Sequence, residues 1–201
     1  MIDEVISLLR AQARGRRVTV AVFCRGNPAL VARVAAEGHP TLVVGDRFGP
    51  LHAAFGLVPR EPGDGLVFAE ARLDALPVAP GSVDVVILSM GLPSRVAPAS
   101  AISLFMDLVK PGGLVVWPHP ASDTARGRLG TMLVPWRPGM ARAVPRHEQS
   151  ALAMRCGLSN VAQIAAARPF FPWVITWGRV GPRPWLKKVG HGLSGPNIVE
   201  S

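Results

Sequence analysis

The sequence predicts an α/β fold of the doubly wound kind, in which helices cover both faces of a parallel sheet. Two short apolar runs, at residues 83–88 and 114–117, are rich in β-branched residues and are bounded by turn residues. This pattern is typical of strands that are buried on both faces. Between the runs, residues 99–109 carry apolar side chains at helical spacing. A strand, a helix and a second strand in this order predict a parallel sheet.

The first part of the chain shows the same alternation of helices and strands. Residues 2–14 place acids in a first turn, arginines in a last turn and Gly15 after it, as expected of a capped amphipathic helix. We predict strands at residues 18–23, 41–44 and 66–69, and a helix at residues 29–37 between the first two strands.

The second part of the chain begins with a long segment that has few periodic features. Residues 118–146 are rich in Pro, Gly and Arg, and a loop of this length is functional or mobile, so a lid and an insertion both stay open. A last helix is predicted at residues 148–156, followed by strands at 161–167 and 173–180. The pattern predicts one domain, residues 1–180, and an extended basic tail, residues 181–201.

The composition is that of a chain with one sizeable core. About half of the 201 residues are hydrophobic, which suits a single domain that buries about 70% of its unfolded surface. No apolar stretch is long enough for a transmembrane segment, and the Asp3-Glu4 start differs from a secretory signal, so we expect a cytoplasmic protein. Cys24 and Cys156 lack metal-ligand spacing, so neither a metal site nor a disulfide framework is predicted.

Basic residues are concentrated in the last third of the chain. The net charge is +9; residues 1–125 hold 11 basic and 11 acidic residues, whereas residues 126–201 hold 11 basic and two acidic ones. Four of the five tryptophans also lie in the last third. A basic, aromatic surface suits nucleic acid, anionic lipid or an acidic substrate; the alternative is an arginine-rich composition with packed tryptophans. The candidate substrate-binding or polyanion-binding residues are Arg126, Arg128, Trp136, Arg137 and Arg142.

Three ordered motifs carry a family resemblance. They are Asp74-Ala75-Leu76-Pro77, the run at residues 80–89, and Lys110-Pro111-Gly112-Gly113. With this order and spacing, residues 18–180 resemble a class I S-adenosylmethionine-dependent methyltransferase domain of the small-molecule, "type 11"-like kind. The resemblance implies a Rossmann-like, mostly parallel seven-stranded sheet with an antiparallel edge, and S-adenosylmethionine as the cofactor.

The resemblance also implies a cofactor loop after the first strand. The family has a glycine-rich loop there, because side chains would obstruct the cofactor's methionine moiety. In this chain Gly26 stands at a family glycine position, Cys24 and Pro28 replace the flanking glycines, and Val22 replaces the usual acid. Cys24, Gly26 and Asn27 are therefore candidate cofactor-binding residues.

Four further residues complete the implied cofactor site. Asp46 follows the second predicted strand, where an acid accepts hydrogen bonds from the ribose hydroxyls; a capping role is its alternative. Arg72 takes the place of the acid that meets the adenine amino group, and a guanidinium cannot accept that hydrogen bond. Leu73 and Ser89 are the other candidates, while Asp84 matches a family position that is more often structural.

The sequence contains no catalytic motif, and methyl transfer from a sulfonium needs little acid or base catalysis. His119, expected just after the fifth strand, is the first candidate for a general base; its alternative is a loop histidine bonded to the backbone. The fourth strand ends in Ser89-Met90-Gly91-Leu92-Pro93 rather than Asn/Asp-Pro-Pro-aromatic, which disfavours methylation of adenine or glutamine.

Two functional hypotheses follow. The first is an S-adenosylmethionine-dependent methyltransferase that acts on a small-molecule or anionic substrate. The second is a catalytically inactive, methyltransferase-like protein that binds nucleic acid or a protein partner through residues 126–201. The altered glycine loop and the charge asymmetry motivate the second hypothesis.

Overall fold

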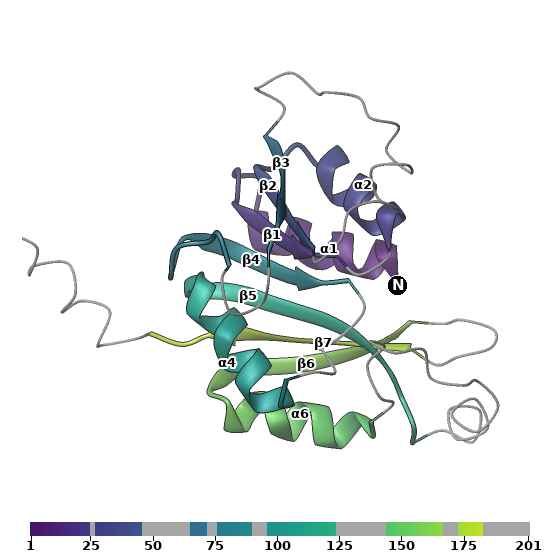
Figure 1. The fold of residues 1–201 in the computed structure, drawn as a ribbon. Helices are drawn as coiled ribbons and strands as arrows, with labels where there is room; N and C mark the ends of the chain where they lie inside the picture. The colour runs from purple at the N-terminus through teal and green to yellow at the C-terminus, as the bar shows by residue number, and fades with distance from the viewer. Residues whose placement is uncertain are drawn as a thin grey trace, which may run out of the picture.

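Seven strands form one sheet in the order β3-β2-β1-β4-β5-β7-β6 in the computed structural model of this chain (Figure 1). The structure describes residues 1–24, 27–45, 65–71, 76–89, 96–123, 144–166 and 173–182. The strands are β1 (Val20–Phe23), β2 (Thr41–Gly45), β3 (Leu66–Glu70), β4 (Val83–Leu88), β5 (Val109–Pro120), β6 (Leu158–Ala166) and β7 (Trp173–Val180). The helices are α1 (Ile2–Ala13), α2 (Pro28–Ala36), α4 (Pro98–Leu108) and α6 (Arg146–Arg155).

The strand directions confirm the predicted doubly wound, mostly parallel sheet with an antiparallel edge. β1 pairs in parallel with β2 and β4, β2 with β3, and β4 with β5. β7 runs antiparallel to both β5 and β6. The reversed strand therefore lies between β5 and β6, and β6 forms the edge of the sheet.

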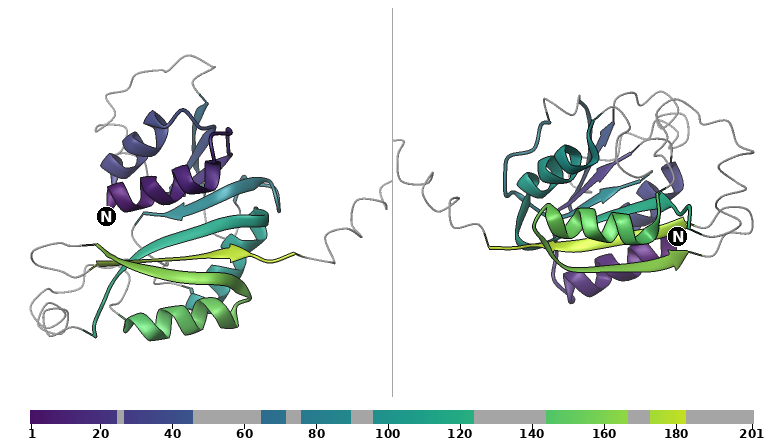
Figure 2. Two further views of the ribbon diagram at one scale, coloured as in Figure 1. Left: turned by 180° about the vertical axis from the view of Figure 1, so that it is seen from behind. Right: turned by 90° about the horizontal axis from the view of Figure 1, so that it is seen from below.

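Helices cover both faces of the sheet (Figure 2). Residues alternate between the faces along each strand, so Val20 and Val22 of β1 face one core, and Ala21 and Phe23 face the other. The first core contains the apolar residues of α1 and α2, and the second contains those of α4 and Ala153 of α6. No helix in the described part of the chain is long and apolar enough to span a membrane.

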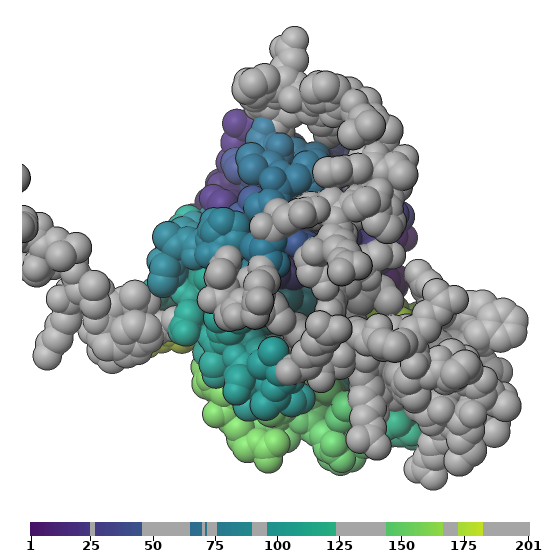
Figure 3. Space-filling view, viewed as in Figure 1, coloured from purple at the N-terminus to yellow at the C-terminus, as the bar shows by residue number. Residues whose placement is uncertain are grey.

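The second core is built around large aromatic side chains. Phe105 of α4 is 0% exposed and meets Phe23 of β1 edge to face, with ring centroids 4.7 Å apart. Trp117 of β5 is also 0% exposed, and its indole Nε1–H donates to Gln149 Oε1 of α6 at 3.2 Å. α4 and α6 contact each other, and their side chains form one continuous part of the surface (Figure 3).

The predicted turn at residues 111–113 lies inside β5. α4 ends at Leu108 and β5 begins at the next residue. Val83 pairs with Val109 and Val85 with Leu114, so residues 110–113 of β5 stand opposite the single residue 84 of β4. These extra residues form a large bulge at the start of the strand, because strand pairing resumes on both sides of them.

Other boundaries also differ from the sequence-based expectation. The predicted loop at residues 118–146 is too long at both ends. Residues 118–120 belong to β5, because β7 continues to pair with β5 past the end of β4, and residue 146 already belongs to α6. α6 ends one residue earlier than predicted. β6 begins at Leu158, earlier than predicted, because Leu158 and Ser159 already pair with β7 before a bulge near Asn160, whose φ is 49°. β7 has the predicted bounds.

Candidate functional site

The carboxyl ends of the parallel strands form the candidate site. The strand order reverses between β1 and β4, and ligands of open α/β sheets bind at such a switch point. Two backbone hydrogen bonds join the ends of neighbouring strands here. Cys24 N donates to Val44 O at 2.8 Å, and Ser89 N donates to Phe23 O at 3.0 Å. Cys24, which follows β1, and Ser89, which follows β4, are far apart in the sequence but both lie at the carboxyl end of β1.

Asn27 fixes the start of the helix that follows β1. Its Oδ1 accepts a hydrogen bond from Leu30 N at 3.2 Å, which makes Asn27 the N-cap of α2, and Pro28 stands at the first helical position. Pro28, which stands where the resembled family has a glycine, thus has a local role, because its fixed φ suits the first turn of a helix. The amino end of α2 carries a partial positive charge and points toward this edge of the sheet.

The structure describes three of the predicted cofactor-binding residues: Cys24 and Ser89 lie at the carboxyl end of β1, and Asn27 caps α2, the helix that follows β1. The other four, Gly26, Asp46, Arg72 and Leu73, lie outside the described residues.

The chain neighbours of Asp46 and Arg72 are described. Gly45 ends β2, and Ala71 N donates to Gly45 O at 3.0 Å. Gly45 and Ala71, which directly precede Asp46 and Arg72 in the sequence, are thus hydrogen-bonded to each other at this edge of the sheet.

Val22 is a core residue and brings no charge to the site. It is 0% exposed and packs with Val43 and Ile87 in the core under α1 and α2. An isolated carboxylate at this position would be costly, since burial of an unpaired charge is strongly unfavourable. The replacement of the family acid is therefore compatible with the packing of β1.

His119 lies inside β5 and not after it, so its expected placement is wrong. It pairs with Val174 of β7, and its side chain is 1% exposed. Its Nε2 lies 2.9 Å from Thr176 Oγ1, and its Nδ1 lies 3.3 Å from Pro120 O. A carbonyl oxygen can only accept, so this contact favours a proton on Nδ1 and leaves Nε2 to accept from the Thr176 hydroxyl.

The hydrogen bonds continue from His119 to the rest of the protein. Gln163 Nε2 donates to Thr176 Oγ1 at 2.9 Å and also lies 2.9 Å from Arg146 O. Burial lowers the pKa of His119 from 6.5 to about 4, against the opposing effects of the Pro120 carbonyl and of Asp123. His119 is therefore a neutral, bonded group that links β5 and β7, which is closer to the backbone-bonded alternative than to a general base.

The buried histidine predicts a loss of stability in mild acid. The unfolded chain binds a proton at His119 below about pH 6.5, whereas the folded chain does so only near pH 4, so stability falls as the pH drops through this window. We expect the free energy of unfolding to be about 2 kcal/mol lower at pH 5 than at pH 7 on account of this group. Urea unfolding at both pH values measures the difference.

A matched pair of variants isolates this effect. His119→Gln removes the titrating ring and is expected to lose most of the difference between pH 7 and pH 5. His147→Gln removes an exposed histidine of α6 and is expected to keep it. Equal pH dependence in the two variants would show that another group titrates.

Asp84 has a structural role. Its Oδ2 accepts from Thr19 N at 2.8 Å and from Lys110 Nζ at 3.0 Å. Burial alone would raise the pKa of Asp84, but these hydrogen bonds and the charges of Lys110 and Arg16 hold it below its usual value of 3.8. The carboxylate thus ties the entry of β1 to the starts of β4 and β5.

The predicted substrate-binding or polyanion-binding residues cannot be placed in the site. Arg126, Arg128, Trp136, Arg137 and Arg142 all lie outside the described residues. Of the two cysteines, Cys24 is buried and Cys156 is half-buried. Among the described residues, no group of three or more His, Cys, Asp or Glu is placed to hold a metal ion.

Sequence reasoning missed a group of cationic side chains at the opposite edge of the sheet. Arg14, Arg16, Lys110 and Arg179 surround one cavity at the amino ends of the strands. No single motif contains all four, because they come from separate positions in the sequence that only the strand order brings together. The one sequence signal is Lys110, which belongs to the Lys-Pro-Gly-Gly motif.

Comparisons with known proteins place the fold. No protein-family model and no curated protein matches this sequence. Among solved structures, 1,6-didemethyltoxoflavin-N1-methyltransferase from Burkholderia thailandensis, with bound 1,6-didemethyltoxoflavin and S-adenosylhomocysteine, is 16% identical with a TM-score of 0.69; the match covers 90% of this chain and 78% of that one.

Two further structures share the fold. Magnesium protoporphyrin IX methyltransferase from Synechocystis, with bound S-adenosylhomocysteine, is 15% identical with a TM-score of 0.66, covering 89% of this chain and 81% of that one. The [4+2]-cyclase SpnF is 12% identical with a TM-score of 0.65 and the same coverage, 89% and 81%. The chain therefore has the class I methyltransferase fold, as the resemblance implied.

Proposed function

We propose that this protein is an S-adenosylmethionine-dependent methyltransferase that acts on a small-molecule or anionic substrate. The observation that carries the proposal is the position of Cys24 and Ser89 at the switch point of a class I methyltransferase fold, with Asn27 capping the helix that follows β1. The similar Burkholderia and Synechocystis enzymes were crystallised with S-adenosylhomocysteine, which supports the same cofactor here.

The chain's own residues would bind and orient the cofactor. Asp46, which follows Gly45 at the end of β2, would accept hydrogen bonds from the ribose hydroxyls. The backbone around Cys24 and Gly26 and the amino end of α2, capped by Asn27, would face the methionine moiety, whose carboxylate suits a helix amino terminus. Arg72, Leu73 and Ser89 would border the adenosine.

The bound cofactor supplies a methyl group that is already activated as a sulfonium, so the protein mainly has to position the acceptor. The buried and bonded state of His119 supports a structural role for this residue rather than proton transfer. We therefore propose a substrate whose accepting atom needs no strong base from the protein.

Binding of S-adenosylhomocysteine tests the proposal directly. We expect micromolar affinity by calorimetry for the wild-type protein, and an affinity lower by about tenfold or more for Asp46→Ala, since two charge-assisted hydrogen bonds are lost. Asp3→Ala is the matched control, because Asp3 is an exposed aspartate of α1 whose ion pair with Arg33 is a long contact of 3.4 Å. This control is expected to bind like the wild type.

One result would contradict the proposal. If the wild-type protein gives no binding signal at millimolar S-adenosylhomocysteine, the altered loop does not form a working cofactor site. The fold alone does not decide the reaction, since the cyclase SpnF shares it. The non-catalytic hypothesis would then be the one to pursue.

A further inference from the structure

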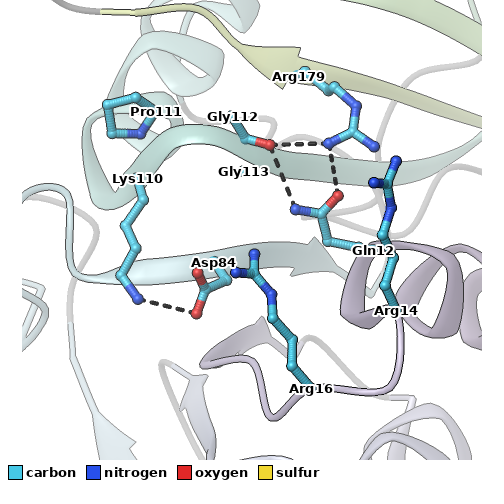
Figure 4. A pocket seen from close by; sticks show the side chains of 9 residues that line it. All are labelled: Gln12, Arg14, Arg16, Asp84, Lys110, Pro111, Gly112, Gly113 and Arg179. Atoms are coloured by element: carbon cyan, nitrogen blue, oxygen red, sulfur yellow. Dashed lines mark hydrogen bonds and ion pairs between the residues drawn. The ribbon is translucent and has the colours of Figure 1, made fainter.

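A cavity of about 590 Å³ opens at the amino ends of the parallel strands (Figure 4). It lies at the edge of the sheet opposite to the candidate cofactor site. Most of its lining residues precede or begin β1, β4 and β5, and Arg179 lies near the end of the antiparallel strand β7, whereas the candidate cofactor residues follow β1 and β4. Its volume falls within the range typical of small-molecule sites. The lining residues are Gln12, Arg14, Arg16, Asp84, Lys110, Pro111, Gly112, Gly113 and Arg179.

The bulge at the start of β5 shapes this cavity. Residues 110–113 stand opposite Asp84 alone, so they leave the plane of regular pairing and form one wall. Gly113 packs so tightly that an added Cβ would lie 2.5 Å from Asp84 O. Gly112, with φ +80°, has nothing within 4 Å of such an atom. The wall is thus fixed on its sheet side and open on the cavity side.

Two of the four cations in the wall are held by protein partners. Arg179 Nη1 donates to Gln12 Oε1 at 2.7 Å and to Gly112 O at 3.0 Å, and Gln12 is only 8% exposed. Lys110 Nζ donates to Asp84 Oδ2 at 3.0 Å. These contacts fix the positions of Arg179 and Lys110, as expected of a preformed site.

The side chains of the other two cations, Arg14 and Arg16, have no hydrogen-bond partner among the described residues, and Arg16 acts on Asp84 only through its charge. Both side chains are exposed and extend from the end of α1 into the space that Lys110 and Arg179 border (Figure 4). Neither forms an ion pair with a carboxylate within the described ranges. The negative end of α1 favours a cation at Arg14, but Arg16 lies beyond the helix.

The charge of the cavity is strongly unbalanced. Its lining holds four basic side chains and one acidic side chain, Asp84. Asp84 is already hydrogen-bonded to Thr19 N and Lys110 Nζ, so it cannot neutralise the three guanidinium groups as well. Like charges that gather in a concave site repel one another unless an anion joins them.

We propose that this cavity is a binding site for a phosphorylated small molecule. A guanidinium presents a planar fork that pairs with two phosphate oxygens at once, and the three arginines can surround a group that carries more than one negative charge. A single carboxylate would leave most of the positive charge unpaired. The site goes beyond the proposed methyltransferase activity and does not depend on it.

Inorganic pyrophosphate is the probe for this site. We expect the full-length protein to bind pyrophosphate at low ionic strength with one-to-one stoichiometry in calorimetry. The double variant Arg14→Gln/Arg16→Gln is expected to bind it about tenfold or more weakly, since two charge-assisted contacts are lost. Arg179 stays in place in this variant, so the Gln12 and Gly112 contacts are kept.

A second double variant, Arg17→Gln/Arg155→Gln, is the matched control. It removes the same charge from two exposed arginines that do not line the cavity, one of them next to Arg16. We expect it to bind pyrophosphate within about twofold of the wild type if contacts in the cavity rather than net charge determine the affinity. Thermal unfolding checks that both double variants are folded.

Three results would overturn the proposal. They are the absence of pyrophosphate binding at millimolar concentration, an equal loss of affinity in the two double variants, and displacement of pyrophosphate by saturating S-adenosylhomocysteine, which would place it at the other edge. Retained binding with the cofactor product present supports two separate sites. Failure of cofactor binding alone would leave this site intact, so the two proposals can fail separately.

Discussion

Trp117→Ala is expected to lower the free energy of unfolding by about 3–5 kcal/mol, as large-to-small changes at fully buried aromatic residues do. Trp117 is among the largest fully buried side chains and fills the core between β5, α4 and α6. Loss of the indole would leave a cavity. It would also remove the hydrogen-bond donor to Oε1 of Gln149, a residue that is only 5% exposed. Such a change is a large part of the stability of an ordinary domain.

Urea unfolding followed by circular dichroism measures this effect. Trp117→Phe is the control, because phenylalanine keeps most of the volume but lacks the indole N–H. We expect this control to cost about 1–3 kcal/mol, the penalty for an unpaired buried polar group plus a smaller cavity. If Trp117→Ala cost less than Trp117→Phe, the packing of α6 on the sheet would have to be different.

Gly113→Ala is expected to cost about 3 kcal/mol of stability, at the upper end of the usual range for overpacking. The added Cβ would lie 2.5 Å from both Asp84 O and Val109 Cγ1, and the carbonyl belongs to the backbone of β4 and cannot turn away. The strands would have to separate where Asp84 joins Thr19 and Lys110. Relief by side-chain movement is therefore not available at this position.

Gly181→Ala is the matched control for the glycine change. An added Cβ at Gly181 meets nothing within 4 Å, so its free energy of unfolding should stay within about 0.5 kcal/mol of the wild type. Both variants can be compared by urea unfolding under the same conditions. A cost for Gly113→Ala as small as that of the control would contradict the close approach of β5 to β4.

The elements that sequence reasoning predicted well are those with a strong local signal. The apolar run of β4 between turn residues and the amphipathic pattern of α1 specify each element within its own segment. β7 could also be bounded, because prolines and phenylalanines at 169–172 precede its apolar residues and Gly181-Pro182 follows them. The class of fold then followed from the order of elements.

The features that could not be predicted depend on partners that are distant in the chain. His119 lies in a strand because residues 173–176 of β7 extend the ladder beyond β4, and no local pattern at residues 118–120, with two prolines, indicates a strand. The bulge at residues 110–113 follows from the register with Asp84. The grouping of the arginines around the cavity at the amino ends of the parallel strands also depends on distant partners, because these arginines lie up to 165 positions apart in the sequence.

The place of β7 between β5 and β6 has a consequence for the order of folding. β7 is the last strand in the described part of the chain, yet it is the hydrogen-bonded neighbour through which β6 joins the rest of the sheet. During synthesis on the ribosome, residues 158–166 emerge before the strand that anchors them. The sheet can close only once residue 180 has left the exit tunnel, so its completion is a late event that depends on contacts distant in sequence.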